Sequence, residues 1–410
     1  MLTVVSLEEA KSIVRECFDL AGALACEHVS LEEAAGRVLA EDVVAQEGIP
    51  PFDRSMMDGF AVRAADTFGC SESLPAILDL AGEVLMGAAP ECSYLPGSCV
   101  RIPTGGQIPE GADAVVMLEY CEEYGDGTIG VTKPVAPAAN IAFENDDVAP
   151  GQVIMRAGTR LRPHHVGTLA SMGCCDVNVR ARPRVGVIST GDEIVPVSAT
   201  PKAAQMRDVN APMLAAAARA LGAVATCYPI VPDDYDTLLA EVSKALGEND
   251  ILLVSGGSSA GARDNTAAVL SQLGKLLFHG IAMKPGKPTI CADVQGKPAF
   301  GLPGHPVAAN FAFLELVAPL IEADCGAFSM RAVRAVAAET IPSNHGRAEL
   351  VAVRLEQGSD CVDGESLAVP IRSKSGLISR LCEADGYIVI PRNLEGVAAG
   401  SPVEVKPFVL

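Results

Sequence analysis

The sequence of 410 residues contains no tryptophan, and aromatic residues make up only 4% of it. Apolar residues nevertheless account for 49%, so the hydrophobic cores must be built largely from alanine, valine, leucine and isoleucine. Together with a charged fraction of 20%, this composition excludes a disordered chain of low hydrophobicity. A chain of this length is too long for one ordinary core and predicts roughly two to four domains.

Positive charge is scarce. Lysine and arginine together number 31 against 51 aspartates and glutamates, which gives a net charge of −20. A nucleic-acid-binding surface needs lysine and arginine to replace counterions, so we expect no nucleic-acid partner. Docking on anionic lipid is disfavoured for the same reason. An anionic small ligand is not excluded, because helix N-termini and a few placed cations hold phosphate even in an acidic protein.

The 13 cysteines contain no C-x-x-C pair and are odd in number, which disfavours a zinc framework or a secreted disulfide scaffold. No uncharged apolar run reaches the roughly 18 residues that a membrane-spanning helix needs. The N-terminus MLTVVSLEEA lacks a basic segment followed by an apolar one, so no secretory signal is predicted. We therefore expect a cytoplasmic protein with no membrane partner.

The first 182 residues predict two domains. The hexapeptide VSLEEA occurs at residues 5–10 and 29–34, and each copy contains a Ser-x-x-Glu capping box that predicts a helix start. Short apolar runs between glycine and proline turns predict a β-rich module over 45–147. Residues 148–182 contain more short strands, and we expect them to return to residues 1–44 as one discontinuous domain.

The remaining chain predicts two further domains. Residues 183–330 alternate short buried strands with helices, which indicates a parallel sheet with helices on both faces. Residues 331–410 have no long helical pattern, and their alternating apolar runs predict a small β-barrel or sandwich.

Glycine and acidic residues cluster directly after three strands of the predicted α/β domain. Ligands of open α/β sheets bind outside the carboxyl ends of the strands, so the three loops predict one pocket for a polar ligand. Glycine there lets backbone N–H groups approach anionic oxygens. The alternative is three tight strand–helix turns without a ligand. The candidate pocket residues are Thr190, Gly191, Asp192, Glu193, Ser255, Gly256, Gly257, Ser258, Asp264, Pro303, Gly304 and His305.

Two other segments carry candidate charges. Lys284 and Lys287 lie three residues apart on a loop stiffened by proline and glycine, which suits a diphosphate or another oxyanion, although a solvated basic turn has the same pattern. Residues 50–60 place Asp58 among prolines in the β-rich module. A carboxylate there suits Mg²⁺, and a rigid structural loop is the alternative. No loop matches the P-loop or the G-x-G-x-x-G fingerprint, which disfavours nucleotide kinases and Rossmann dehydrogenases.

Six segments resemble signatures of the MoeA family of molybdopterin molybdenumtransferases, in the same order and at similar spacings. They are PPFDRSMMDGFAVR, PTGGQIPEGADAVV, STGDE, SGGSSAGARD, IAMKPGKP and GLPGHPVAAN. The family is similar to the molybdenumtransferase domain of gephyrin. The resemblance implies a multidomain α/β plus β fold, with a molybdopterin-binding parallel α/β domain, a β-rich module, an elongated discontinuous domain and a C-terminal β-barrel-like domain. It also implies a homodimer whose active site lies between the α/β domain of one subunit and the β-rich module of the other.

The reaction that the resemblance implies begins with adenylylated molybdopterin (molybdopterin-AMP). The enzyme binds it with Mg²⁺, takes molybdate onto the dithiolene and cleaves the pyrophosphate bond, releasing AMP. Thr104, Asp233 and Asp234 join the substrate-binding set, and which of the two aspartates faces the pocket is left open. The catalytic residues carried over by position are Asp58, Glu193, Asp264, Lys284 and Lys287, of which Asp58, Glu193 and Asp264 are also the candidate Mg²⁺ ligands.

The chain departs from the family pattern at two places. The family often has asparagine at the position of His305, and histidine can still donate a hydrogen bond there. The family is usually rich in arginine after Asn140-Ile141, whereas residues 142–147 read AFENDD, with Asp147 aligning with the last acid of the pattern. Loss of the arginines weakens the attraction for anions, which keeps tungstate as an alternative oxyanion.

Two other functions remain as alternatives. One is the preceding step, molybdopterin adenylyltransfer, which the multidomain layout and the loop at residues 50–60 disfavour. The other is a scaffold or cofactor carrier that keeps the fold without the chemistry, which the presence of Asp58, Glu193, Asp264 and the two lysines disfavours.

Overall fold

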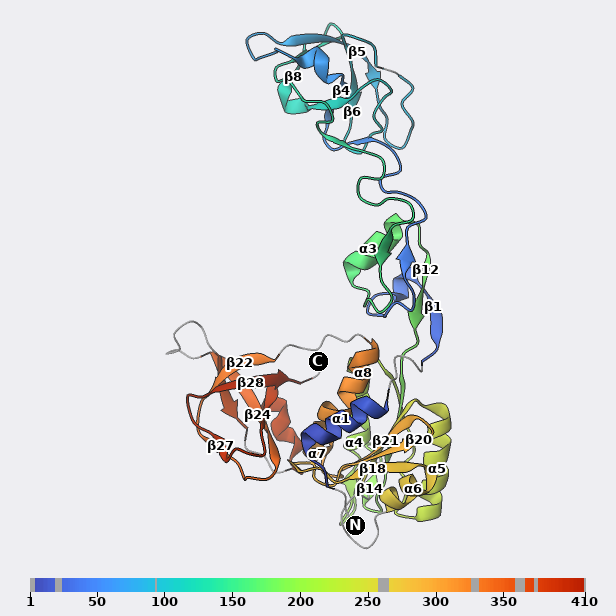
Figure 1. Ribbon diagram of the computed structural model, residues 1–410, viewed down its shortest axis with the longest axis vertical. Helices are drawn as coiled ribbons and strands as arrows, with labels where there is room; N and C mark the ends of the chain where they lie inside the picture. Colours follow the sequence, from blue (N-terminus) through green and yellow to red (C-terminus); the bar gives the residue numbers. More distant parts are fainter. Residues whose placement is uncertain are drawn as a thin grey trace.

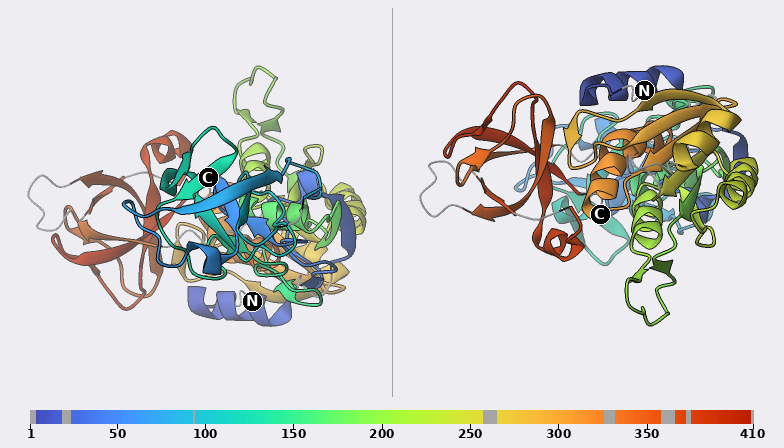
Figure 2. Two further views of the ribbon diagram at one scale, coloured as in Figure 1. Left: turned by 90° about the horizontal axis from the view of Figure 1, so that it is seen from above. Right: turned by 90° about the horizontal axis from the view of Figure 1, so that it is seen from below.

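The structure is a computed structural model that describes residues 4–18, 24–92, 94–256, 265–325, 332–357, 366–371 and 375–408. The molecule is elongated (Figure 1). An α/β domain and a β-barrel form a base, and a narrow stalk carries a β-rich module well away from it. Viewed along the long axis, the barrel lies beside the α/β domain (Figure 2). The distal β-rich module and the base are therefore separate parts of one chain.

The α/β domain contains a six-stranded sheet with the order β16-β13-β17-β21-β20-β18. The first four strands are parallel, as predicted. Strand β20 runs antiparallel to both of its neighbours, β18 and β21, because short connections, and not crossover helices, join it to them. The strands are β13 (Arg184–Ser189), β16 (Val224–Cys227), β17 (Ile251–Ser255), β18 (Lys275–His279), β20 (Ile290–Val294) and β21 (Lys297–Leu302).

Helices cover both faces of this sheet. Alternate residues of a strand point to opposite faces, so Val187 packs with α4 and α7, whereas Ile188 packs with α5 and α6. The segment Pro306–Ala323 has the length and hydropathy of a membrane span, but 72% of it is buried inside the protein, as in a core helix. The helices are α4 (Asn210–Ala220), α5 (Tyr235–Glu248), α6 (Asn265–Leu273), α7 (Pro306–Ala312) and α8 (Ala318–Cys325), with a π-helical turn (Phe313–Val317) between the last two.

The two predicted capping boxes have different outcomes. The first is confirmed: Ser6 and Glu9 cap helix α1 (Leu7–Cys17). Helix α1 packs into the core of the α/β domain, and not with the rest of segment 1–44 as we expected from the sequence. The second prediction is wrong, because Ser30 ends strand β1 and only a 3₁₀ turn (Leu31–Glu33) follows, without a side-chain cap.

The stalk is built from two segments that flank the distal module in the sequence. Strand β1 (Cys26–Ser30) pairs with β12 (Asp176–Arg180), and β2 (Val43–Val44) pairs with β11 (Val153–Met155). Helix α3 (Pro163–Ser171) packs against them through Leu169. The chain thus runs out through the stalk and back again, which makes the distal module an insertion.

The distal module contains a six-stranded sheet with the order β7-β4-β6-β5-β9-β8. Its core includes Phe60, Val116 and Ile129, together with the buried thiol of Cys99. Burial raises the pKa of Cys99 to about 12, so this thiol stays protonated and packs as an apolar group. The strands are β4 (Gly59–Val62), β5 (Ala76–Glu83), β6 (Ser98–Ile102), β7 (Ala114–Met117), β8 (Cys121–Glu123) and β9 (Thr128–Val131), and β3 (Arg54–Ser55) pairs separately with β10 (Ile141–Ala142).

The C-terminal part is a closed barrel, as predicted. Strand β24 pairs with both β25 and β26, and this second pairing closes the ring β24-β25-β22-β28-β26. The strands are β22 (Val333–Ala337), β24 (Ala348–Gln357), β25 (Ser366–Pro370), β26 (Gly386–Ile390) and β28 (Pro402–Pro407). The remaining short strands are β14 (Ile194–Val195), β15 (Met206–Arg207), β19 (Met283–Lys284), β23 (Ile341–Pro342) and β27 (Gly396–Val397).

A buried carboxylate joins the parts of the base. Glu315 lies in the π-helical turn and is only 2% exposed. It accepts hydrogen bonds from Lys11 of α1, from Lys406 Nζ at 2.6 Å and from Tyr387 Oη at 2.7 Å. Burial raises the pKa of Glu315, but the two lysine charges together outweigh burial and hold the pKa below its usual value. The cluster ties the N-terminal helix and the barrel to the α/β domain.

Candidate active site

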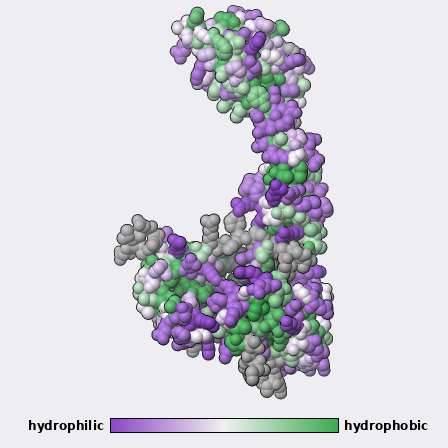
Figure 3. All heavy atoms as spheres, in the orientation of Figure 1, coloured by the Kyte–Doolittle hydropathy of each residue, from purple (hydrophilic) through white to green (hydrophobic). Residues whose placement is uncertain are grey.

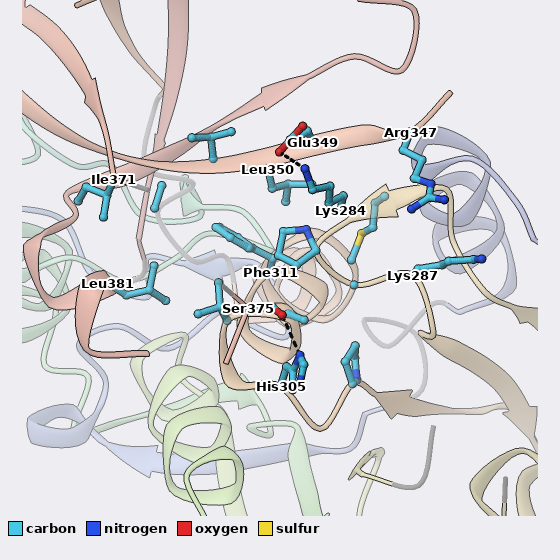
Figure 4. Close-up of a pocket in the computed structure, with 18 of the residues that line it drawn as sticks. Lys284, Lys287, His305, Phe311, Arg347, Glu349, Leu350, Ile371, Ser375 and Leu381 are labelled. Carbon is cyan, nitrogen blue, oxygen red and sulfur yellow. Dashed lines mark hydrogen bonds and ion pairs between the residues drawn. The ribbon is translucent and has the colours of Figure 1, made fainter. Parts of the chain in front are cut away.

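A cavity of about 1290 Å³ lies between the α/β domain and the barrel (Figure 4). Loops at the carboxyl ends of β13, β17 and β21 form its floor, as expected for an open α/β sheet. Strand β24 of the barrel and the chain around β19 form the opposite wall. From the residues predicted as a site, the cavity brings together Glu193, Asp233, Gly256, Lys284, Lys287, Pro303, Gly304 and His305.

The floor loops pass so close to one another that glycine is required. Gly256 has φ +111°, and a Cβ atom there would lie 2.1 Å from the carbonyl oxygen of Thr190. Thr190 N donates to Ser255 O at 2.9 Å, and Gly304 lies against Gly256. The described parts of the three loops that the sequence singled out therefore lie against one another.

The acidic residues of the floor are held in different ways. The Glu193 side chain is exposed and lines the cavity, as does Asp233, whose Oδ1 accepts from Thr190 Oγ1 at 3.1 Å. Asp234 instead caps helix α5, because its carboxylate accepts from the side chain and the backbone of Thr237. These bonds lower the pKa of Asp234. Asp233, and not its neighbour, is thus the aspartate of this pair that faces the cavity.

Gly191 and Asp192 border a second cavity of about 710 Å³ on the other side of the same loop. Asp192 Oδ1 accepts from Asp233 N at 3.1 Å, which links the two loops. Glu193 belongs to the larger cavity and Asp192 to the smaller one. The segment 190–193 therefore separates the two cavities.

Three cationic side chains line the larger cavity. Lys284 Nζ pairs with Glu349 Oε1 at 2.8 Å, and the other oxygen of Glu349 accepts from Ser343 Oγ at 2.8 Å. Lys287 and Arg347 lie near the same end of the cavity, on the chain after β19 and just before β24, respectively (Figure 4). The cations thus come from both the α/β domain and the barrel.

The His305 side chain contacts the barrel directly. Its Nδ1 lies 2.7 Å from Ser375 Oγ, and Val307 N donates to Ser375 O at 3.2 Å (Figure 4). An asparagine, which the family often has here, is shorter than histidine. His305, where the chain departs from the family pattern, therefore contacts the barrel at the edge of the cavity.

The barrel contributes residues that the sequence did not reveal. These residues form no motif with a recognisable spacing. The alternating apolar pattern of β24 predicts a strand, but it does not predict which part of the protein covers each face of that strand. Only the position of Arg347 beside a glycine, just before the strand, hinted at an exposed cation. The polar barrel residues of the cavity are Glu339, Thr340, Arg347, Glu349 and Ser375.

Asp58 and Thr104 do not reach this cavity within one chain. They lie in the distal module, where Asp58 Oδ1 accepts from Thr104 N at 2.7 Å and from Thr104 Oγ1 at 2.9 Å (Figure 1). The backbone bond and then the hydroxyl bond lower the pKa of Asp58. Met56 and Met57 of the same loop are exposed, and apolar areas are visible on this module (Figure 3). Asp58 is thus an ionised carboxylate on an open surface.

Three predicted site residues, Gly257, Ser258 and Asp264, lie outside the described residues. The remaining carboxylates can be tested against Mg²⁺. Within the described ranges, no group of three His, Cys, Asp or Glu side chains is arranged to hold a metal. Mg²⁺, however, usually binds one or two carboxylates together with substrate phosphates and water. Glu193 and Asp233 on the cavity floor fit that requirement.

Family models match almost the whole chain. The MoeA N-terminal region (domains I and II) matches residues 5–173, a probable molybdopterin-binding domain matches 186–323, and the MoeA C-terminal region (domain IV) matches 334–408. The molybdopterin molybdenumtransferase of Bacillus subtilis is 34% identical over 386 residues, covering 92% of this chain and 89% of the relative. A putative molybdopterin biosynthesis protein of Methanocaldococcus jannaschii is 35% identical over 391 residues, covering 92% and 91%.

Solved structures agree with the sequence relatives. A crystal structure of a MoeA protein from Pyrococcus horikoshii superposes with a TM-score of 0.82 at 33% identity, covering 99% of this chain and all of that one. A second one superposes with a TM-score of 0.84 at 36% identity, covering 99% of each chain. These matches confirm the predicted multidomain α/β plus β fold. The chain belongs to the MoeA family of molybdopterin biosynthesis proteins.

Proposed function

We propose that this protein is a molybdopterin molybdenumtransferase, which inserts molybdate into adenylylated molybdopterin and releases AMP. The observation that carries the proposal is the cavity at the sheet's carboxyl edge, where three glycine-containing loops meet four carboxylates and three cations. Its volume of about 1290 Å³ exceeds the range of roughly 300–1,000 Å³ typical of pockets for drug-sized ligands, as suits a substrate that joins a pterin to a nucleotide. The relative from Bacillus subtilis carries this enzyme's name.

The charges of the cavity support a role for Mg²⁺. Its lining includes four carboxylates (Glu193, Asp233, Glu339 and Glu349) but only three cationic side chains. Side chains alone therefore do not make the cavity attractive to a pyrophosphate or to molybdate. When bound at Glu193 and Asp233, Mg²⁺ would supply the missing positive charge beside the phosphates. Asp264 remains a further proposed ligand.

The cationic side chains have two proposed tasks. Lys287 of the α/β domain and Arg347 of the barrel are placed to attract the oxyanion and to offset charge on the phosphoryl oxygens. Lys284 is paired with Glu349, so it holds the barrel wall in place and also offers a charge to the substrate. Chemistry of this type depends on positioning and electrostatics more than on a protein nucleophile.

We also propose that the active form is a homodimer. Asp58 and Thr104 belong to the carried-over site, yet the stalk holds them far from the cavity of their own chain (Figure 1). A two-fold dimer would let Asp58 of the partner subunit complete the site. The exposed methionines beside Asp58 suit such an interface. We place the enzyme in the cytoplasm, where free thiols such as those of the described cysteines are usual.

Turnover of purified adenylylated molybdopterin tests the proposal. The substrate is supplied with Mg²⁺ and with molybdate or tungstate in turn, and AMP release is followed. We expect release that depends on both Mg²⁺ and molybdate. Release without any oxyanion, or strong adenylylation of molybdopterin from ATP, would contradict the proposal and favour the adenylyltransferase alternative.

A further inference from the structure

We propose that Asn210 is a positioning residue of the active site, which holds two of the floor loops at the spacing that substrate binding requires. Asn210 is the first residue of helix α4 and is only 7% exposed. The Nδ2 group donates to Ser255 Oγ at 2.7 Å and to the carbonyl oxygen of Gly304 at 2.8 Å. One amide thus bridges the loop after β17 and the loop after β21.

The bridge lies directly beneath the cavity floor. Gly304, whose carbonyl oxygen accepts one of the two bonds, and Gly256, which follows Ser255, both line the cavity. Ser255 also accepts, at its carbonyl oxygen, the backbone bond from Thr190 that fixes the third loop. Within the part of the chain that the structure describes, the Asn210 amide hydrogen-bonds to Ser255 and to the Gly304 backbone and to no charged side chain, so we infer that its effect on substrate passes through these loops.

The carboxamide oxygen of Asn210 supports a role for this geometry beyond stability. Asn210 Oδ1 is buried and accepts no hydrogen bond, the only such side-chain atom among the described residues. A buried oxygen without a partner costs free energy, and such atoms in native proteins are rare. The bond to the Gly304 carbonyl requires the NH₂ group on this side, which leaves the oxygen unpaired.

A second buried asparagine provides a matched control. Asn249 is 3% exposed and its Nδ2 also donates to two groups, Tyr228 Oη at 2.7 Å and Ala245 O at 2.9 Å. It lies two residues before strand β17 and therefore at the amino edge of the same sheet, opposite the cavity. Asn249 shares the burial and the bonding of Asn210 but not its position.

The test compares Asn210→Asp with Asn249→Asp in the full-length protein. Aspartate keeps the shape of asparagine, but its carboxylate cannot donate to the Gly304 carbonyl and repels it. Two quantities are measured: KM and kcat for adenylylated molybdopterin, and amide hydrogen exchange in peptides containing residues 255–256 and 303–305. The KM measurement rests on the proposed function, whereas the exchange measurement does not.

We expect Asn210→Asp to raise KM by roughly tenfold relative to Asn249→Asp, with kcat changed by less than about threefold, and to speed exchange in both loops. Equal KM values in the two folded variants would overturn the inference. If the wild-type protein showed no turnover, the proposed function would fail, and faster loop exchange in Asn210→Asp alone would still support the bridge. Should Asn210→Asp not fold, Asn210→Ser, which is too short to span both acceptors, replaces it.

Discussion

The base and the distal module carry the predicted site residues in contrasting settings. In the base, charged side chains from two domains line one hollow and are held by one another, as Lys284 is by Glu349. In the distal module, Asp58 lies on an open surface and its carboxylate accepts hydrogen bonds from Thr104 of the same module. The contrast teaches that the predicted site residues are divided between two distant regions of one chain. Under the proposed function, substrate binds in the base, and the proposed dimer would bring the distal carboxylate of a partner subunit to it.

The largest effect is expected from Glu193→Ala. This change removes an exposed carboxylate from the floor, and with it a proposed Mg²⁺ ligand, without disturbing a buried core. We expect molybdate-dependent AMP release to fall by about 10³-fold or more, with unfolding unchanged. Glu241→Ala, on helix α5 away from the cavity, is the control. Unchanged AMP release would remove Glu193 from the mechanism.

Much of the base could be predicted from the sequence. The loops at residues 190–193, 255–256 and 303–305 follow buried strands, and parallel strands bring their carboxyl ends to one edge. The role of Asp234 was also open to local analysis, because an aspartate three residues before a threonine N–H at a helix start suits a cap. Local sequence patterns are enough to predict the place of a residue when a single helix or strand positions it.

The rest of the site could not be predicted, because it depends on contacts between domains. Nothing in the sequence around Arg347 or Ser375 says that the barrel faces the α/β domain. The helix predicted at the second VSLEEA copy is absent for a related reason. Its serine, Ser30, belongs to strand β1, which pairs with β12, about 150 residues away in the sequence. Tertiary pairing there overrides a local helix signal.

Asp58→Asn sharpens the comparison from the distal side. We expect AMP release to fall by about 10²-fold with no loss of stability, since the carboxylate lies on the surface. Because hydrogen bonds from Thr104 lower the pKa of Asp58, the group stays ionised at any pH above its ordinary value of 3.8. The rate of the wild-type enzyme should therefore show no change caused by titration of Asp58 at pH values above 3.8. Asp126→Asn, in the same module, is the control.

Lys287→Ala tests the oxyanion end of the base. Lys287 lines the cavity, whereas Lys244, the control, lies on helix α5, where it pairs with Glu241 and lies over the ring of Tyr228. We expect the KM for molybdate to rise by about tenfold in Lys287→Ala and to be unchanged in Lys244→Ala. The wild-type KM should also rise with ionic strength. Equal KM values in both variants would show that Lys287 does not attract the oxyanion.

The smallest effect on activity is expected from Glu315→Gln, which acts on the contact between helix α1, the α/β domain and the barrel. The variant loses charge-assisted bonds to Lys11 and Lys406, and we expect a loss of about 1–3 kcal/mol in unfolding free energy at neutral pH. The folded-state pKa of Glu315 lies below its usual value of 4.5. Its stabilisation is therefore fully present above pH 4.5 and is lost as pH falls through the folded-state pKa.

Thermal unfolding of the wild type and Glu315→Gln across this pH range measures the difference. The two proteins should converge as the solution becomes acidic. A difference that grows on acidification would contradict the ion-pair account of this contact. The distal module should unfold alike in both proteins, because Glu315 makes no contact with it.

Mixing two inactive variants tests most directly the central claim that the base of one chain works with the distal module of another. Glu193→Ala and Asp58→Asn chains are unfolded, combined in equal amounts and refolded together, and AMP release is measured. A site shared across a two-fold dimer predicts recovery of roughly a quarter of wild-type activity, since half of the dimers are mixed and each mixed dimer has one intact site. No recovery, with mixed dimers verified by mass, would contradict the claim.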